Sequence, residues 1–298
     1  MIVFYADHHV VDLPPGHRFP MAKYAALRHR LMDEGVLRAD ELHASGAIER
    51  RALLRVHTPD YVDAFLDGRL NRAEQRNLGL PWSRALVGRT LASAFGTLAA
   101  ARAALSFGAA GNLAGGTHHA FAGHGEGFCV FNDLAVAART LLDEGAVGRV
   151  LVVDLDVHHG NGTAAIFADE PRVWCLDVHG ANNYPFTKPP ADLDVPLPDG
   201  TTDAPYLQAL RPALETALEQ SQPDLIFYQA GVDPLASDKL GRLSLSFAGL
   251  QARDRMVLEL AHHHQIPIAL TLGGGYARPI TDSIQAHVQT YKLLKTLY

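Results

Sequence analysis

The chain has few cysteines and few long apolar runs. Only Cys129 and Cys175 occur in 298 residues. Two cysteines cannot form a disulfide framework, so we expect free thiols in a reducing compartment. The amino terminus lacks a basic region followed by a long apolar run, and no later stretch has the length expected of a membrane span. We therefore expect a cytoplasmic protein with no membrane segment.

Strong charge of either sign is also missing. Charged residues make up 19% of the chain, apolar residues make up 48%, and the net charge is -6. These values are ordinary for a globular domain and leave no basic surface for nucleic acid. Histidine is the unusual residue, with 16 copies, several of them beside glycine or a carboxylate. Metal chemistry is the first function class that this composition indicates.

Short apolar runs alternate with longer stretches of helical periodicity, which predicts one α/β domain over residues 1–298. Its sheet should be mainly parallel, with helices on both faces. The predicted strands are 2–5, 109–113, 149–155, 173–178, 225–230 and 268–272, and the predicted helices are 20–34, 81–107, 133–144, 205–220, 247–264 and 279–297. Residues 10–17 and 180–200 are predicted loops, and Thr58-Pro59-Asp60 predicts a helix start.

Polar clusters follow five of these predicted strands. The carboxyl ends of parallel strands meet at one edge of the sheet, and ligands bind at that edge. We therefore expect His, Asp and Tyr side chains from five segments to lie along one rim, with the active site among them. The five segments are 115–119, 154–161, 177–179, 231–233 and 273–276.

The sharpest local signal is the segment DLDVHHGNG at 154–162. Alternate residues of an extended chain share a face, so Asp154, Asp156 and His158 point the same way. Asp154 lies deepest and suits an orienting role, whereas Asp156 and His158 suit a metal. The plainer alternative is a polar strand end without a metal, which the repeated spacing of carboxylate and imidazole disfavours.

Asp233 is a candidate third ligand, because it follows the run Leu225 to Tyr228. An Asp before Pro is commonly a turn-former, so on its own it is ambiguous. Three protein ligands would leave room for water and substrate, as catalytic zinc sites require. Two carboxylates also weaken a divalent ion as a Lewis acid, so the protein should supply further acid, base and electrophilic groups.

Two glycine-rich segments offer such groups. His118 and His119 lie in GGTHHA, and Tyr276 lies in GGGY. A tyrosine after three glycines could simply pack over a loop, but beside a metal its hydroxyl can donate to a developing oxyanion. Paired histidines can also be structural, as we expect for those at 262–264, which fall in a helical pattern.

Six segments together resemble the histone deacetylase family. They are HRFPMAKY (17–24), GGTHHA (115–120), GFCVFND (127–133), DLDVHHGNGT (154–163), GVDPLASDKLGRLSLS (231–246) and GGGY (273–276). They occur in family order and span nearly the whole chain. Arginases are similar in fold, but GGTHHA and GGGY fit deacetylases and do not fit a two-manganese centre. The short length and the RFPM segment resemble compact class IV-like and bacterial members most.

The resemblance implies a role for each matching residue. Asp156, His158 and Asp233 would hold zinc, with iron as an alternative. His119 matches the general base, His118 its electrostatic partner, Tyr276 the oxyanion donor and Asp154 the carboxylate that orients His118. Asn161 stands where class I members have a second orienting carboxylate, so His119 should stay neutral more easily.

The resemblance also implies substrate and ion contacts. Phe128 and Phe186 match the aromatic walls of an acyl-lysine channel, and Gly127 and Gly274 match backbone contacts with the substrate. A structural potassium ion would lie against the strand ends, where Asp177 replaces a common serine. The residues of that expected site are Asp154, Asp156, His158, Asp177 and Val178.

The resulting hypothesis is a metal-dependent amide hydrolase that removes an acetyl or other acyl group from acyl-lysine in peptides or proteins. Water attacks the amide carbonyl, His119 takes its proton, Tyr276 donates to the oxyanion, and a protonated histidine releases the amine. Acetylpolyamines or other small acylated amines are alternative substrates. A catalytically silent metal-binding module is disfavoured, because His118, His119 and Tyr276 are not needed to hold a metal.

Overall fold

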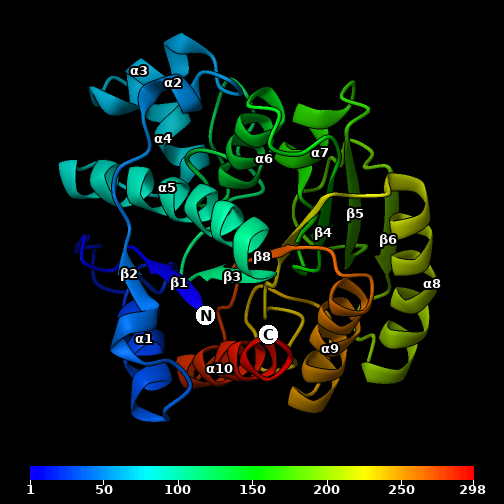
Figure 1. Ribbon diagram of the computed structural model, residues 1–298. Coiled ribbons are helices and arrows are strands. Elements are labelled where there is room, and N and C mark those ends of the chain that lie inside the picture. Colours follow the sequence, from blue (N-terminus) through cyan, green and yellow to red (C-terminus); the bar gives the residue numbers. More distant parts are fainter.

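All eight strands run parallel in one sheet, in the order β2-β1-β3-β8-β7-β4-β5-β6 (Figure 1). The computed structural model describes residues 1–298, and the predicted α/β architecture is confirmed. The strands are β1 Ile2–Tyr5, β2 Leu42–Ala44, β3 Ala109–Asn112, β4 Val150–Asp154, β5 Val173–Gly180, β6 Leu193–Leu197, β7 Leu225–Gln229 and β8 Ile268–Thr271.

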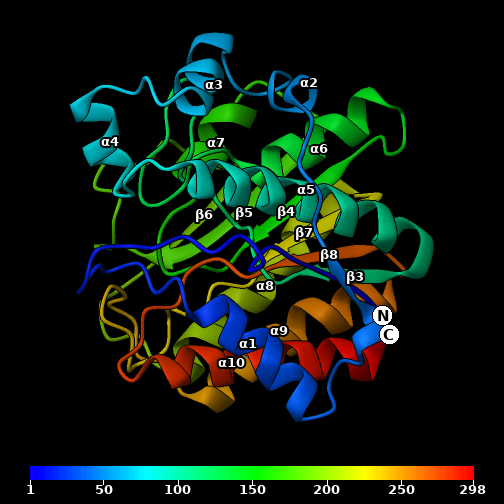
Figure 2. The same ribbon diagram turned by 90° about the vertical axis from the view of Figure 1, so that its left-hand side faces the viewer.

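The helices form a layer on each face of this sheet (Figures 1 and 2). One layer contains α5, α6 and α7, with the short helices α2 to α4 beyond them, and the other contains α1, α8, α9 and α10. The helices are α1 Lys23–Asp33, α2 Arg50–Leu53, α3 Pro59–Leu66, α4 Arg72–Leu78, α5 Arg84–Phe107, α6 Asp133–Asp143, α7 Asn161–Phe167, α8 Asp203–Ser221, α9 Phe247–His263 and α10 Ile280–Leu297, with a 3-10 turn at Ala39–Glu41.

The central strands pack on both faces, which explains their continuous apolar sequences. Along β4, Leu151 and Val153 join the core beneath α8 to α10, whereas Val150 and Val152 join the core beneath α5 and α6. Burying a large aliphatic side chain contributes about 1.5–3 kcal/mol, so this two-sided core holds the strand ends firmly in register.

Six predicted strands and six predicted helices are confirmed, with ends that shift by a few residues. The sequence prediction missed the edge strands β2 and β6. β6 lies inside the predicted loop 180–200 and contains Pro196, which an edge strand tolerates because one of its sides needs no partner. The helix start at Thr58 is confirmed by α3, with Pro59 in its first turn.

The expectation that no stretch has the length of a membrane span was wrong. Helix α5 has 24 residues and a mean hydropathy of 1.2 over its most apolar window, so by length and composition alone it could cross a membrane. Here it packs against β1, β3, β8 and α6, and half of that window is buried inside the protein. Its many alanines allow this close packing in the core layer.

A buried arginine joins the ends of β4 and β7. The guanidinium of Arg253, on α9, donates to the carbonyls of Leu155 and Gly231 at 3.0 and 2.6 Å, and it pairs with Asp254 at 2.7 Å. Both carbonyls lie directly beyond the strand ends, next to the segments that carry the candidate metal ligands. Arg253 therefore fixes the spacing between these two segments.

We expect Arg253→Met to lower the free energy of unfolding by about 3–5 kcal/mol, because two carbonyls would lose their buried donor and the Asp254 carboxylate would keep only the Tyr228 and Thr290 hydroxyls in place of its cation. Urea unfolding measures this loss. The matched control is Arg255→Met on the same helix, because Arg255 is half-exposed and pairs only with Glu259. Its cost should stay within about 0.5 kcal/mol. Equal costs for the two variants would contradict the bridging role.

Candidate active site

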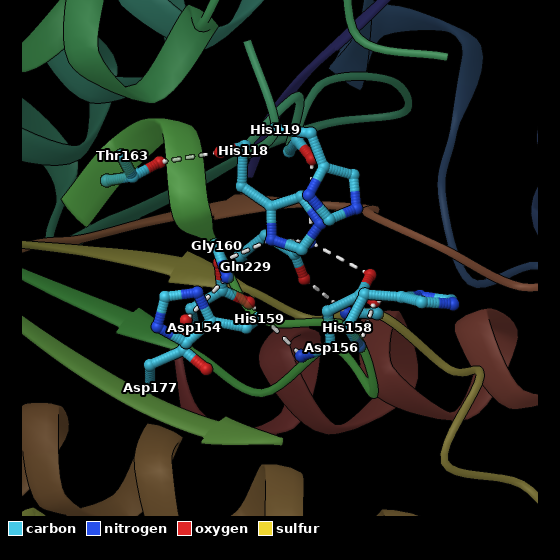
Figure 3. Close-up of polar contacts among 12 residues, drawn as sticks. His118, His119, Asp154, Asp156, His158, His159, Gly160, Thr163, Asp177 and Gln229 are labelled. Carbon is cyan, nitrogen blue, oxygen red and sulfur yellow. Dashed lines mark hydrogen bonds and ion pairs between the residues drawn. The ribbon is translucent and has the colours of Figure 1, made fainter. Parts of the chain in front are cut away.

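Three of the five predicted polar segments, 115–119, 154–161 and 273–276, line one cavity of about 420 Å³. Residues far apart in the sequence line it, among them residues from the ends of β3, β4 and β8 and from the loops between 115 and 131. Figure 3 shows His118, His119, Asp156 and His158 of its wall. Eight predicted site residues lie in its wall, namely His118, His119, Gly127, Phe128, Asp156, His158, Gly274 and Tyr276.

Three candidate metal ligands converge at the end of β4. The Nδ1 atom of His158 lies 2.9 Å from Asp156 Oδ1 and 3.1 Å from Asp233 Oδ2. Tetrahedral zinc with ligand distances of about 2.0–2.1 Å separates its donor atoms by about 3.3 Å. All three residues are buried. The spacing and the chemistry of this donor set therefore fit one divalent ion.

Three further observations support this fit. Asp233 Oδ2 is buried and accepts no hydrogen bond, although Asp233 Oδ1 accepts one from the Val157 N–H at 2.9 Å. A Cβ atom on Gly274 would lie 1.9 Å from Asp233 Oδ2 and 2.8 Å from Asp156 Oδ2. Any residue other than glycine here would therefore displace the two ligand carboxylates. Burial, together with the charge of Asp156, raises the pKa of Asp233 to about 7. A cation between the two carboxylates would relieve this repulsion.

His118 is paired with a carboxylate, as the resemblance implies. Its Nδ1 lies 2.7 Å from Asp154 Oδ2, and both side chains are buried. Burial lowers the pKa of His118, but the negative charges of Asp154 and Asp156 outweigh that effect and raise it to about 9. The pair therefore favours a charged imidazolium inside the cavity wall.

His119 has the opposite electrostatic character. Its Nδ1 lies 2.7 Å from Asn161 Oδ1, and its ring lies 4.1 Å from that of His118 between centroids. Burial, reinforced by the positive charges of His118 and His158, holds the pKa of His119 well below its usual value. Of the two adjacent histidines, His119 is thus the neutral one, with its free ring nitrogen available to accept a proton.

Tyr276 and Phe128 also line the cavity, with their ring centroids 6.2 Å apart. Phe128 has a φ of +68°, a conformation that costs energy for a bulky residue and commonly marks functional sites. The hydroxyl of Tyr276 has no protein partner among the hydrogen bonds of this structure, and burial raises its pKa well above the usual value. Tyr276 therefore remains protonated and able to donate.

The second aromatic wall differs from the prediction. Phe186 is 88% exposed and does not line the cavity, so this assignment was wrong. Tyr184 lines the cavity instead, and its ring lies 5.1 Å from that of His119. The loop after β5 carries both aromatic residues, and sequence spacing alone could not tell which of them turns inward.

Two other residues at the site were missed. Gln229, the last residue of β7, donates to Asp156 Oδ2 at 2.9 Å and orients this candidate ligand. Glu126 accepts a hydrogen bond from the Asn161 amide at 2.6 Å. Gln229 ends an apolar run and Glu126 lies in a glycine-rich loop, so neither belongs to a pattern that predicts function. By contrast, the histidines at 262–264 are exposed, away from this cavity.

A second group of His and Asp side chains lies behind the first. His159, Asp177, His179 and Asp194 offer donor atoms within 4.8 Å of one another. Two ion pairs link them, because His179 Nδ1 lies 2.7 Å from Asp177 Oδ1 and His159 Nε2 lies 3.0 Å from Asp194 Oδ1, whereas His159 Nδ1 is buried without a partner. Asp177 is thus engaged with His179, at the position where a potassium contact was expected.

Comparison with known proteins agrees with this geometry. A family model described as the histone deacetylase domain matches residues 17–291. The chain belongs to the histone deacetylase family. Over 290 residues it is 33% identical to Histone deacetylase 2 of Arabidopsis thaliana, covering 90% of this chain and 73% of that protein. Over 297 residues it is 44% identical to an uncharacterized protein of Picosynechococcus sp., covering 100% and 99% of the two chains.

Solved structures of histone deacetylase homologues have the same fold. One of them, complexed with SAHA, matches 99% of this chain and 84% of its own, with a TM-score of 0.85 and 25% identity. The predicted family and fold are confirmed. Members of this fold family depend on a metal, and Asp156, His158 and Asp233 are the candidate ligands in this histone deacetylase-family protein.

Proposed function

We propose that this protein is a zinc-dependent deacylase that hydrolyses the amide bond of acyl-lysine in peptides or proteins. The observation that carries the proposal is the convergence of three kinds of group on one cavity. These are a His/Asp ligand set, a neutral histidine and a tyrosine hydroxyl without a protein partner. A silent metal-binding module would need only the first of these.

Asp156, His158 and Asp233 would hold the metal ion, and the donor set accommodates zinc or ferrous iron. When bound, the ion polarises the substrate carbonyl and makes water a stronger nucleophile at neutral pH. Asp177 and Val178 on β5, beside the β4 residue Asp154, are our proposed contacts for a structural potassium ion, together with Asp156 and His158. Asp154 and Asp177 lie directly opposite each other in the sheet register, which supports this placement.

The protein side chains would handle the proton and the oxyanion. His119 accepts a proton from the attacking water through its free ring nitrogen, while Asn161 holds the other nitrogen. Tyr276 donates a hydrogen bond to the tetrahedral oxyanion. His118, held by Asp154, keeps positive charge beside the developing negative charge, and a protonated histidine then releases the amine.

The cavity shape supports an acyl-lysine substrate. Phe128 and Tyr184 line it with flat apolar surfaces, which suit the methylene chain of lysine. A solved homologue of similar fold is complexed with SAHA. The test is a screen of purified protein against acyl-lysine peptides and acetylpolyamines, with the metal content measured on the same sample. Hydrolysis of neither substrate class by metal-loaded protein would contradict the proposal.

The same screen tests a prediction about selectivity. Glu74 is the only acidic residue between Asp67 and Glu126, and it is occupied in capping α4 through Asn71. Three arginines, Arg18, Arg76 and Arg89, line the cavity. Because this charge pattern repels polycations, kcat/KM for an acetylpolyamine should not exceed that for an acetyl-lysine peptide. Little selectivity among peptide sequences is also expected. A ratio far above one would favour the polyamine substrate.

A further inference from the structure

A line of hydrogen bonds runs from His119 to the protein surface. His119 Nδ1 contacts Asn161 Oδ1 at 2.7 Å, and Asn161 Nδ2 donates to Glu126 Oε1 at 2.6 Å. The same Glu126 oxygen accepts a hydrogen bond from the Tyr184 hydroxyl at 2.8 Å. Asn161 begins α7, whereas Glu126 and Tyr184 lie on separate loops. Three segments of the chain are therefore joined at one carboxylate.

The polarity of the Asn161 amide decides which proton His119 carries. An ionised carboxylate only accepts hydrogen bonds, so Glu126 requires the NH₂ group of Asn161 to face it. The amide oxygen then faces His119 and accepts a hydrogen bond from Nδ1–H. In the neutral ring this leaves the lone pair on Nε2, where a general base needs it.

Without Glu126 nothing in these contacts would impose that orientation. A reversed amide would place its NH₂ group against His119, so that Nδ1 becomes an acceptor and the proton moves to Nε2. A ring protonated at Nε2 cannot take a proton from water there. A carboxylate at position 161 would not need such control, because both of its oxygens accept.

The surroundings of Glu126 keep it in place. Its side chain is only 19% exposed. Nε2 of the half-exposed His124 lies 3.7 Å from Glu126 Oε2. The following residue, Gly127, has a φ of +56°, and a Cβ atom there would lie 2.6 Å from the His119 ring. The backbone at Gly127, next to Glu126, therefore packs directly against the His119 imidazole.

We propose that Glu126 is a positioning residue that fixes the amide of Asn161 and, through it, the proton of His119 on Nδ1. This inference rests on the proposed function of His119 as the base. It assigns a carboxylate to His119, one amide group further away than the carboxylate that the resemblance implies in class I members.

Kinetics of Glu126→Ala provide the first test. We expect kcat to fall by about ten- to a hundredfold, as for partners that orient catalytic groups, with KM within about twofold and metal content unchanged. Glu126→Gln keeps an oxygen that can accept from Asn161, so it should recover most of this loss. The matched control is His124→Ala in the same loop, which removes a neighbour of the carboxylate that does not contact Asn161 and should leave kcat unchanged.

A double-mutant cycle with Asn161→Asp separates positioning from a merely structural role. In the Asn161→Asp background the acceptor is symmetric and needs no orientation, so adding Glu126→Ala should cost nothing. It should even raise kcat, because it removes a like charge from beside the new carboxylate. An equal loss in both backgrounds would overturn the proposal.

Nitrogen-15 NMR of histidine-labelled, zinc-loaded protein reads the tautomer without any substrate. Wild type should show His119 protonated at Nδ1, whereas Glu126→Ala should show the proton at Nε2 or shared between the two nitrogens. Unchanged spectra together with unchanged kcat would overturn the inference. If wild type hydrolyses no acylated amine, the proposed function fails, yet the spectra still decide whether Glu126 sets the tautomer.

Discussion

Asp233→Ala should abolish hydrolysis, with a loss of at least about a thousandfold, because the variant loses one of only three protein ligands. The folded protein should also lose its bound metal during dialysis. Metal analysis and turnover on the same sample measure both effects. In wild type, a chelator should remove activity, and added zinc, cobalt or iron should restore it.

Asp194→Ala is the matched control for this experiment. Asp194 belongs to the second His/Asp group and contacts His159, but it does not reach the three candidate ligands. This variant should keep the catalytic metal and most of the turnover. Full activity of Asp233→Ala in metal-free buffer would overturn the hypothesis that hydrolysis depends on a bound metal ion. Loss of metal from both variants alike would mean that the two groups form one ion site.

Tyr276→Phe should lower kcat by about a hundredfold or more, with metal content unchanged, because it keeps the ring but removes the donor to the oxyanion. KM should change little, since the hydroxyl acts mainly on the tetrahedral state. Steady-state kinetics with an acetyl-lysine peptide measure the split between kcat and KM.

Tyr184→Phe is the informative comparison, because Tyr184 lines the same cavity but its hydroxyl is engaged by Glu126. Its loss should stay below about tenfold, the effect of a hydrogen bond that only orients another group. If the two variants lost kcat equally, the oxyanion role would not belong to Tyr276 alone. Near-normal turnover of Tyr276→Phe would assign that role to another group.

The sequence predicted the centre of the molecule better than its periphery, for a physical reason. Strands such as β4 and β7 are buried on both faces, so their composition is uniformly apolar and their ends are marked by polar residues. The edge strands β2 and β6 lack that constraint, and β6 even contains a proline. Ligands that directly follow buried strands, such as Asp156 and Asp233, were therefore predictable from position.

Residues on loops were harder to assign, because their side-chain directions depend on tertiary packing. Phe186 and Tyr184 lie two residues apart, and only the folded loop shows that Tyr184 turns toward His119. Glu126 follows the same rule: its contact with Asn161 joins positions 35 apart in sequence, and no periodic pattern encodes it. The sequence predicted that His119 has no carboxylate partner, whereas in the fold the Glu126 carboxylate lies behind Asn161, the residue that contacts His119.

The place of β8 in the sheet determines how the two halves of the candidate site are aligned. It is the last strand of the chain, yet it lies between β3 and β7 and is the only strand that joins β2-β1-β3 to β7-β4-β5-β6. Without β8, no strand pairing would connect these two half-sheets. The candidate metal ligands follow β4 and β7 in one half, whereas His118 and His119 follow β3 in the other half and Tyr276 follows β8 itself. The sheet therefore aligns the ligand set with the groups proposed to handle the proton and the oxyanion through the strand that is synthesised last.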